Sequence, residues 1–178
     1  MSYATATDLI TRFSPDELAQ RAAPEGLRVM GDLLQLTVAA GDRTTYSADE
    51  IAAADAALVR ITGVLTDADS DIDAYLSERY TVPLDPAPRV LTRVACDLAR
   101  YYLYDDAVDK DGVIAARYDA AIKMLASIAK GTLKLGDGES DDAVAPVSLP
   151  ATRSSGRTFS QDSLGDYNGR FGAGRQIQ

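Results

Sequence analysis

Histidine is absent from this sequence of 178 residues, and cysteine occurs once, at position 96. The first absence removes the side chain that serves most often as a general base and as a transition-metal ligand. A single cysteine cannot form an internal disulfide, so synthesis in a reducing cytoplasm is expected. The sequence also lacks a glycine-rich phosphate loop and a paired-cysteine zinc spacing. We therefore expect neither enzyme activity nor a cofactor.

Long apolar runs are missing too. No stretch approaches the roughly 20 apolar residues that a membrane-spanning helix needs, and the N-terminus lacks the basic start and apolar stretch of a signal peptide. With 46% hydrophobic and 25% charged residues, the composition is that of a water-soluble globular protein. The length allows one ordinary domain. We expect a protein that is neither exported by that route nor embedded in a membrane.

The charge is negative and unevenly spread. The net charge of −9 argues against binding to the DNA backbone, because that binding depends on Lys and Arg. Residues 151–178 nevertheless carry +2 and the rest of the chain −11. The four basic residues of this end are Arg153, Arg157, Arg170 and Arg175. A basic end on an acidic body favours contact with an acidic surface of a partner or a sister copy, with a solvated tail as the plainer alternative.

Apolar spacing near 3.6 residues predicts an all-α fold built round one long helix. Ser47 and Glu50 form a capping-box pattern, and the residues after them favour an amphipathic helix over 48–79, with room for a kink at Gly63 and Thr66. Unbroken, it would be about 48 Å long. Its predicted buried stripe consists of Ile51, Leu58, Ile61, Leu65, Ala68, Ile72, Tyr75 and Leu76.

Shorter helices are predicted before and after the long one. Thr7 can cap a helix over 8–13, and Pro15 can open a second at its first turn. A proline-rich connector over 81–88 cannot be helical. The remaining predictions are helices over 27–40, 90–104 and 113–130, a stop at Gly131, and a short extended piece over Thr132–Leu135.

The last 42 residues, 137–178, have a different character. They contain six glycines, two prolines and no run that could bury a helical or strand face. Isolated apolar side chains nevertheless occur through them, at Val147, Leu149, Phe159, Leu164, Tyr167 and Phe171. A segment that orders on a partner needs such anchors to offset its loss of entropy. We predict a helical domain over 1–136 and an extended C-terminal arm over 137–178.

An acidic stretch within the long helix resembles a calcium loop, with carboxylates at Asp67, Asp69, Asp71 and Asp73. The sixth position of such a loop requires glycine for a sharp turn, but it holds Ile72, which is in phase with the buried stripe. We interpret the stretch as a solvated acidic helix face. Paired carboxylates for glycosidic chemistry are the alternative, but no substrate-binding aromatic residues accompany them.

Two features of the helix over 90–104 concern packing and contacts. Cys96 follows the apolar spacing of Ala95 and Leu98, which predicts a small buried core residue rather than a nucleophile. The helix ends with Tyr101, Tyr102 and Tyr104, which cannot all face one core. At least one is expected at a surface or subunit contact, and half-buried packing is the alternative.

The ordered set of motifs resembles the Mu-like phage and prophage head-to-tail adaptor family. The matching residues extend over most of the chain: Tyr3-Ala4-Thr5, Asp8-Leu9-Ile10, Phe13, Asp71-Ile72-Asp73-Ala74-Tyr75-Leu76, Arg79-Tyr80, Pro83-Leu84, Ala95-Cys96-Asp97-Leu98-Ala99-Arg100-Tyr101-Tyr102-Leu103-Tyr104, Arg117-Tyr118 and Arg157-Thr158-Phe159-Ser160. The segment over 24–46 is longer than the family's usual link.

The resemblance implies a structural neck protein of the virion, a head-completion connector assembled in the bacterial cytoplasm. Its partners would be the portal protein and a stopper or tail-completion protein. It would form a homo-oligomeric ring of twelve copies, a dodecamer that extends the DNA channel without binding DNA specifically. The acidic residues at 67, 69, 71 and 73 would then face the channel or solvent. A helical regulatory protein that uses its tail as a peptide ligand is the runner-up, and a small hydrolase is a third alternative.

The helical interpretation of the acidic stretch predicts that calcium does not bind there. Calorimetric titration of the protein with calcium should give no saturable heat, because a helix cannot wrap its carboxylates round one ion. A site of micromolar affinity would contradict the helical assignment.

Overall fold

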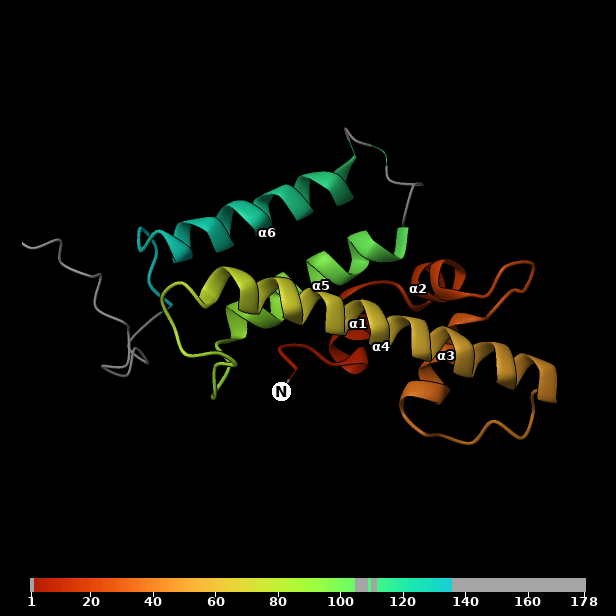
Figure 1. Ribbon diagram of the computed structural model, residues 1–178. Helices are drawn as coiled ribbons and strands as arrows, with labels where there is room; N and C mark the ends of the chain where they lie inside the picture. Colours follow the sequence, from red (N-terminus) through yellow and green to blue (C-terminus); the bar gives the residue numbers. More distant parts are fainter. Residues whose placement is uncertain (1, 105–108, 110–111, 136–178) are drawn as a thin grey trace, which may run out of the picture. The chain divides into compact units, whose positions relative to one another are not determined.

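The structure is a computed structural model that describes residues 2–104, 109 and 112–135. Within these residues it contains only helices and no strand, which confirms the predicted all-α fold (Figure 1). The helices are α1 (Ala6–Arg12), α2 (Pro15–Ala22), α3 (Gly31–Val38), α4 (Ala48–Leu76), α5 (Arg89–Tyr104) and α6 (Val113–Ala129). The predicted arm over 137–178 lies outside the described residues.

Helix α4 is the element against which each of the other five helices packs. It begins as predicted: the Ser47 hydroxyl accepts from the Glu50 N–H, and the Glu50 carboxylate accepts from the Ser47 N–H at 2.8 Å. Its 29 residues run about 43 Å. The helix is continuous through Gly63 and Thr66, where the Thr66 hydroxyl donates to the Thr62 carbonyl at 3.0 Å instead of capping a new helix. It ends three residues before the predicted end.

The buried face of α4 changes in character along its length. From Ile61 onward the predicted residues Ile61, Leu65, Ala68, Ile72 and Leu76 are buried, whereas Tyr75 is only partly buried. In the N-terminal half the buried positions are Ala53, Ala54 and Ala57, whereas Ile51 and Leu58 are only partly buried. Small side chains suit this half, because α2 and α3 lie beside it (Figure 1). The stretch from Asp67 to Asp73 is helical, as predicted.

The two helix starts that were predicted near the N-terminus, at Thr7 and at Pro15, have different outcomes. Thr5, and not Thr7, caps α1, because Asp8 at the third helical position completes a reciprocal capping box with it. The Asp8 carboxylate accepts from the Thr5 hydroxyl at 2.6 Å and from the Thr5 N–H at 2.8 Å, and these two hydrogen bonds lower the pKa of Asp8. Pro15 opens α2 as predicted. The sequence pattern missed Thr5 because Thr5 precedes the apolar residues by a full turn.

Helix α3 is shorter than the predicted helix over 27–40. Leu27 and Met30, which were assigned to its apolar face, are 54% and 51% exposed. The helix begins at Gly31, whose N–H donates to the Asp16 carboxylate of α2 at 3.1 Å. A Cβ at position 31 would lie 2.4 Å from that carboxylate oxygen, so the close approach of α2 requires glycine there.

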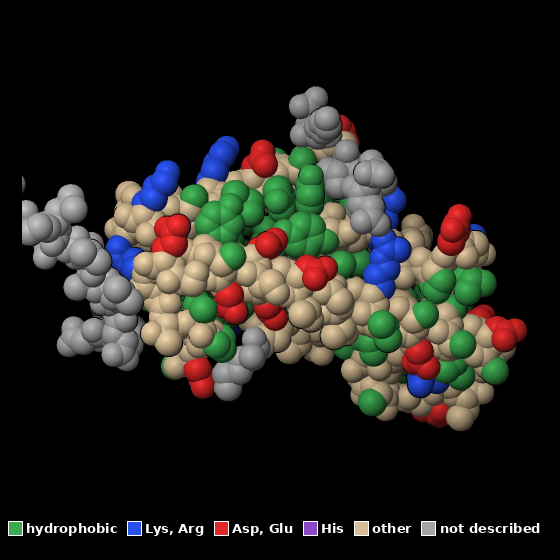
Figure 2. Space-filling view, in the orientation of Figure 1, with side chains coloured by type: hydrophobic (Ala, Val, Ile, Leu, Met, Phe, Trp, Pro, Cys, Tyr) green, Lys and Arg blue, Asp and Glu red, His purple; other side chains and the backbone are tan. Residues whose placement is uncertain are grey.

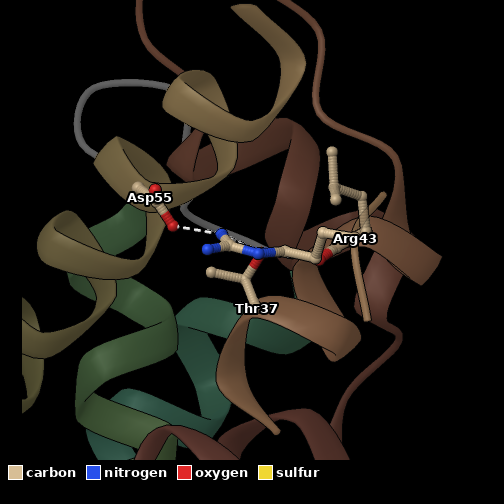
Figure 3. Close-up of polar contacts among 4 residues, drawn as sticks. Thr37, Arg43 and Asp55 are labelled. Carbon is tan, nitrogen blue, oxygen red and sulfur yellow. Dashed lines mark hydrogen bonds and ion pairs between the residues drawn. The ribbon is translucent and has the colours of Figure 1, made fainter. Parts of the chain in front are cut away.

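The loop from α3 to α4 is held by one arginine. The Arg43 guanidinium forms an ion pair with Asp55 of α4 and donates to the Thr37 hydroxyl at 3.4 Å (Figure 3). Thr37 is buried, and its hydroxyl donates in turn to the Leu33 carbonyl at 2.7 Å. This chain of contacts fixes the loop over the N-terminal part of α4.

The end of the described chain agrees in part with expectation. Gly131 has a φ of +73°, the left-handed conformation that stops α6 after Ala129, as predicted. Thr132–Leu135 form no strand, because no neighbouring segment pairs with them within the described residues. Cys96 is buried as predicted, and burial raises the pKa of its thiol to about 12.

The buried stripe of α4 gives a stability prediction. Ile72→Asp should lower the free energy of unfolding by several kcal/mol, because it buries an unpaired charge. Asp67→Ala on the exposed side of the same helix should change it by about 0.5 kcal/mol or less. Urea unfolding followed by circular dichroism measures both, and equal effects would contradict the assigned burial.

Candidate functional site

A groove lined by tyrosine and aspartate lies between α4 and α5. Its volume is about 380 Å³, and it is lined by Val64, Asp67, Asp71, Tyr101 and Tyr102. The Tyr102 hydroxyl donates to the Asp71 carboxylate, and burial together with this hydrogen bond raises the pKa of Tyr102. Hydrophobic side chains gather between α6 and α4 on this side of the protein, with acidic side chains beside them (Figure 2). We call this the tyrosine–aspartate groove.

Two of the predicted tyrosines form the aromatic wall of this groove. The ring of Tyr101 stacks on Tyr118 of α6, with centroids 4.0 Å apart and an angle of 19° between the planes. Tyr102 meets Tyr118 edge to face at 6.1 Å. Tyr101 and Tyr102 are both half-buried. They therefore pack within the protein and also present aromatic surface to the groove.

Tyr104 has a different environment from its two neighbours. Its hydroxyl donates to the Glu17 carboxylate of α2 at 2.7 Å, and the Arg21 guanidinium lies over its ring at 4.3 Å. Glu17 also pairs with Arg100 at 2.6 Å. Tyr104 thus joins α2 to α5 inside the protein, in the packing role that was the alternative to a subunit contact.

The acidic face of α4 is only partly solvated, which corrects the prediction. Asp67 is exposed, but Asp69 accepts from the Tyr3 N–H at 3.0 Å and Asp73 accepts from the Tyr3 hydroxyl. The Tyr3 hydroxyl also accepts from the Leu84 N–H at 3.2 Å. Burial, followed by the hydrogen bond to Asp73, raises the pKa of Tyr3 to about 12. The carboxylates hold the N-terminal segment and the proline-rich connector to α4.

A second groove lies between α1, α5 and α6, and it is lined by arginines. Two hollows of about 320 and 540 Å³ share Arg12 and Arg93 in their walls. Arg117 lines the first hollow and Arg89 the second. Within the part of the chain that the structure describes, none of these four arginines forms an ion pair with a carboxylate. We call the two hollows together the arginine groove.

Asp97 lies in the wall of the arginine groove. One of its carboxylate oxygens is buried and has no hydrogen-bond partner among the described residues. Burial raises the pKa of Asp97, and the positive charges of Arg12, Arg117, Arg93 and Arg100 oppose this rise. One half-buried carboxylate therefore faces several guanidinium groups without neutralising them.

The two grooves are lined by different residues of α5. Arg89, Arg93 and Asp97 line one, and Tyr101 and Tyr102, near the C-terminal end of the helix, line the other. The predictions missed the arginine groove. Its signal on α5 was the spacing of Arg89, Arg93 and Asp97, which share a face away from Leu91 and Leu98. The spacing of residues along the sequence does not predict that Arg12 of α1 and Arg117 of α6 line the same groove.

Several predicted contact residues cannot be located, because the whole arm lies outside the described residues. They are Arg153, Arg157, Phe159, Leu164, Tyr167, Arg170, Phe171 and Arg175. In the described part of the chain no group of three or more Cys, Asp and Glu side chains could hold a metal ion. No helix among the described residues is long and apolar enough to cross a membrane.

Comparison with known proteins identifies the family. The family model described as bacteriophage Mu Gp36 matches residues 3–152, which include both grooves. The chain belongs to the bacteriophage Mu Gp36 family. The Mu-like prophage FluMu protein gp36 of Haemophilus influenzae (strain ATCC 51907 / DSM 11121 / KW20 / Rd) is 30% identical over 104 residues. This match covers 58% of the chain and 72% of the relative. Membership of the Gp36 family indicates a phage structural or morphogenesis protein.

Tyr3 gives a prediction that separates its hydroxyl from its ring. Tyr3→Phe should lower the free energy of unfolding by about 1–3 kcal/mol, because it removes hydrogen bonds to a carboxylate and a backbone N–H. Tyr75→Phe is the control, since no hydrogen bond of its hydroxyl occurs within the described residues. A raised pKa in the folded state means that the stabilisation is complete below about pH 10 and declines as pH rises to about 12. Urea unfolding at pH 8 and pH 11 measures it, and equal loss in both variants would refute the assignment.

Proposed function

We propose that this Gp36-family protein is the adaptor of the virion neck, which joins the portal of the head to the stopper or tail-completion protein. It acts as one subunit of a homo-oligomeric ring of twelve copies that extends the DNA channel. The copy number comes from the resemblance of the sequence to head-to-tail adaptors. The observation that carries the proposal is the pair of unlike grooves along α5 in a protein of a phage Mu family.

Unlike grooves favour a ring because of symmetry. A subunit of a closed ring contacts its two neighbours through two different surfaces, whereas a two-fold dimer uses one surface twice. The arginine groove and the tyrosine–aspartate groove differ in charge and in aromatic content. The half-buried tyrosines also match the residue types that are enriched at protein interfaces.

The charge of the chain supports passage of DNA rather than its capture. With −11 outside residues 151–178, a ring of such bodies would present mainly negative charge, which disfavours adhesion of phosphates. No catalytic role is proposed, because the chain has no histidine and its single cysteine is buried with a raised pKa.

The rival proposal is a regulatory protein that acts as a monomer or dimer and offers its tail as a peptide ligand. Mass photometry of the purified protein, alone and with the purified portal, separates the two. The adaptor should form a ring on the portal, and an electron-microscopy image of the virion neck should show it there. A protein that remains monomeric in the presence of the portal would refute the adaptor role.

The arm gives a direct test of this function. A chain that ends at Gly136 should keep its helical circular dichroism and nearly its full melting temperature, because residues 137–178 have no run that could bury a helix or strand face. It should fail to attach stably to the portal, since the aromatic anchors and arginines of the arm are gone. Completion of phage heads measures this, and equal completion by the truncated and intact chains would eliminate a role for the arm.

Two sets of arm variants separate its apolar and charged contributions. Phe159→Ala should speed dissociation from the portal at every salt concentration, because it removes an apolar anchor. Replacement of all four arginines of the arm by glutamine should slow association, most strongly at low ionic strength. Ser160→Ala, beside the anchor, is the matched control and should change neither rate.

A further inference from the structure

The arginine groove is an unusual feature of an acidic protein. Arg12, Arg89, Arg93 and Arg117 line it together with only two carboxylates, Asp8 and Asp97. The groove therefore carries a local excess of positive charge, although the chain as a whole carries −9. One oxygen of the Asp8 carboxylate accepts hydrogen bonds from Thr5 within the capping box of α1.

The arginines of this groove keep their hydrogen-bonding capacity for another molecule. Arg93 and Arg117 are both exposed, and among the described residues the only hydrogen bond of Arg93 is to the Met124 sulfur at 3.5 Å. Arg117 lies over the ring of Phe13 at 6.0 Å. A guanidinium group has five N–H donors in a planar fork that matches a carboxylate and can also stack on an aromatic ring. The groove is therefore suited to a surface that combines carboxylates with aromatic rings.

We propose that the arginine groove of one copy binds the tyrosine–aspartate groove of a second copy, so that subunits join head to tail. This inference rests on the proposed ring and names the two surfaces that would build it. The guanidinium groups of Arg93 and Arg117 pair with Asp67 and Asp71 of the neighbour and stack on its tyrosine wall. The chain already stacks arginine on aromatic rings internally, with Arg21 over Tyr104 at 4.3 Å and Arg100 over Phe13 at 4.4 Å.

A second copy supplies the groups that this groove suits. Its tyrosine–aspartate groove presents carboxylates beside aromatic rings, which complement the arginines in charge and in stacking. Asp67 is exposed and makes no hydrogen bond or ion pair within the described residues, so it is available to the neighbour. The contact joins two different surfaces, and its head-to-tail repetition generates a ring or a filament.

Site-specific cross-linking of the full-length chain tests the contact. Arg117→Cys and Asp67→Cys place single new thiols in the two grooves, and Cys96 does not interfere because it is 1% exposed with a pKa raised to about 12. A mixture of the two variants treated with a short bismaleimide should give a cross-linked dimer, whereas each variant alone should not. Leu27→Cys, an exposed position between α2 and α3, replaces Asp67→Cys in the control mixture and should give no product.

Neutralising variants measure the same contact in solution. Arg93→Gln with Arg117→Gln should weaken self-association about tenfold or more, as should Asp67→Asn with Asp71→Asn, which keeps an acceptor for Tyr102. Each variant has one intact groove, so an equal mixture should form heterodimers but nothing larger. Mass photometry with and without purified portal reads out the assemblies, and circular dichroism checks folding.

Three outcomes would overturn this inference. The first is cross-linking by Asp67→Cys alone, which would show a face-to-face contact. The second is ring formation on the portal by the neutralised variants at the wild-type level. The third is arginine-dependent binding of a short DNA duplex with micromolar affinity, which would assign the groove to phosphates. Failure of the wild type to form a ring on the portal would instead refute the proposed function, while the mixed cross-link would still support head-to-tail contact.

Discussion

The buried stripe of α4 is the constraint on which the other contacts of the described chain depend. Ile61, Leu65, Ala68, Ile72 and Leu76 are 4% exposed or less, and all five other helices pack against this helix. Burial of each Ile or Leu side chain contributes about 1.5–3 kcal/mol. Helix α4 is continuous from Ala48 to Leu76. The helices that pack at its two ends therefore have a fixed orientation relative to each other. The tyrosine–aspartate groove lies where α5 packs against α4.

The acidic side of the same helix has two roles. Asp69 and Asp73 accept hydrogen bonds from Tyr3, and Asp71 accepts one from Tyr102, whereas Asp67 is exposed. A hydrogen bond to a charged acceptor is stronger than one between neutral groups, so these carboxylates stabilise the fold while they contribute to the negative surface. Substitutions along this face should therefore be interpreted position by position.

Much of the fold could be predicted from local sequence, because capping and apolar spacing act over a few residues. Ser47 with Glu50 identified the start of α4, Pro15 that of α2, and Gly131 the end of α6. The errors arose where a distant segment decided the outcome. Asp16 binds the N–H of Gly31 and so determines where α3 begins, and Tyr3 binds carboxylates that periodicity assigned to solvent.

The candidate surfaces were predictable only in part for the same reason. Tyr101 and Tyr102 could be selected from the sequence because one helix cannot bury three tyrosines so closely spaced. The arginine groove combines Arg12, Arg93 and Arg117 from three helices, and no feature of the sequence indicates that α1 and α6 meet along α5. The net negative charge of the chain even argued against a positively charged groove, because a net charge does not show where positive side chains cluster.

The capping boxes of α1 and α4 have a consequence for behaviour in acid. In each box a carboxylate, Asp8 or Glu50, accepts from the backbone and the hydroxyl of the capping residue, and this lowers its pKa below the ordinary value. The contribution of such a carboxylate is complete above its ordinary pKa, about 4, and is lost as pH falls further. Protonation would weaken the hydrogen bonds that cap the first turn of each helix. At the N-terminal segment the buried side chains of Tyr3 and Leu9 would still hold α1 in place.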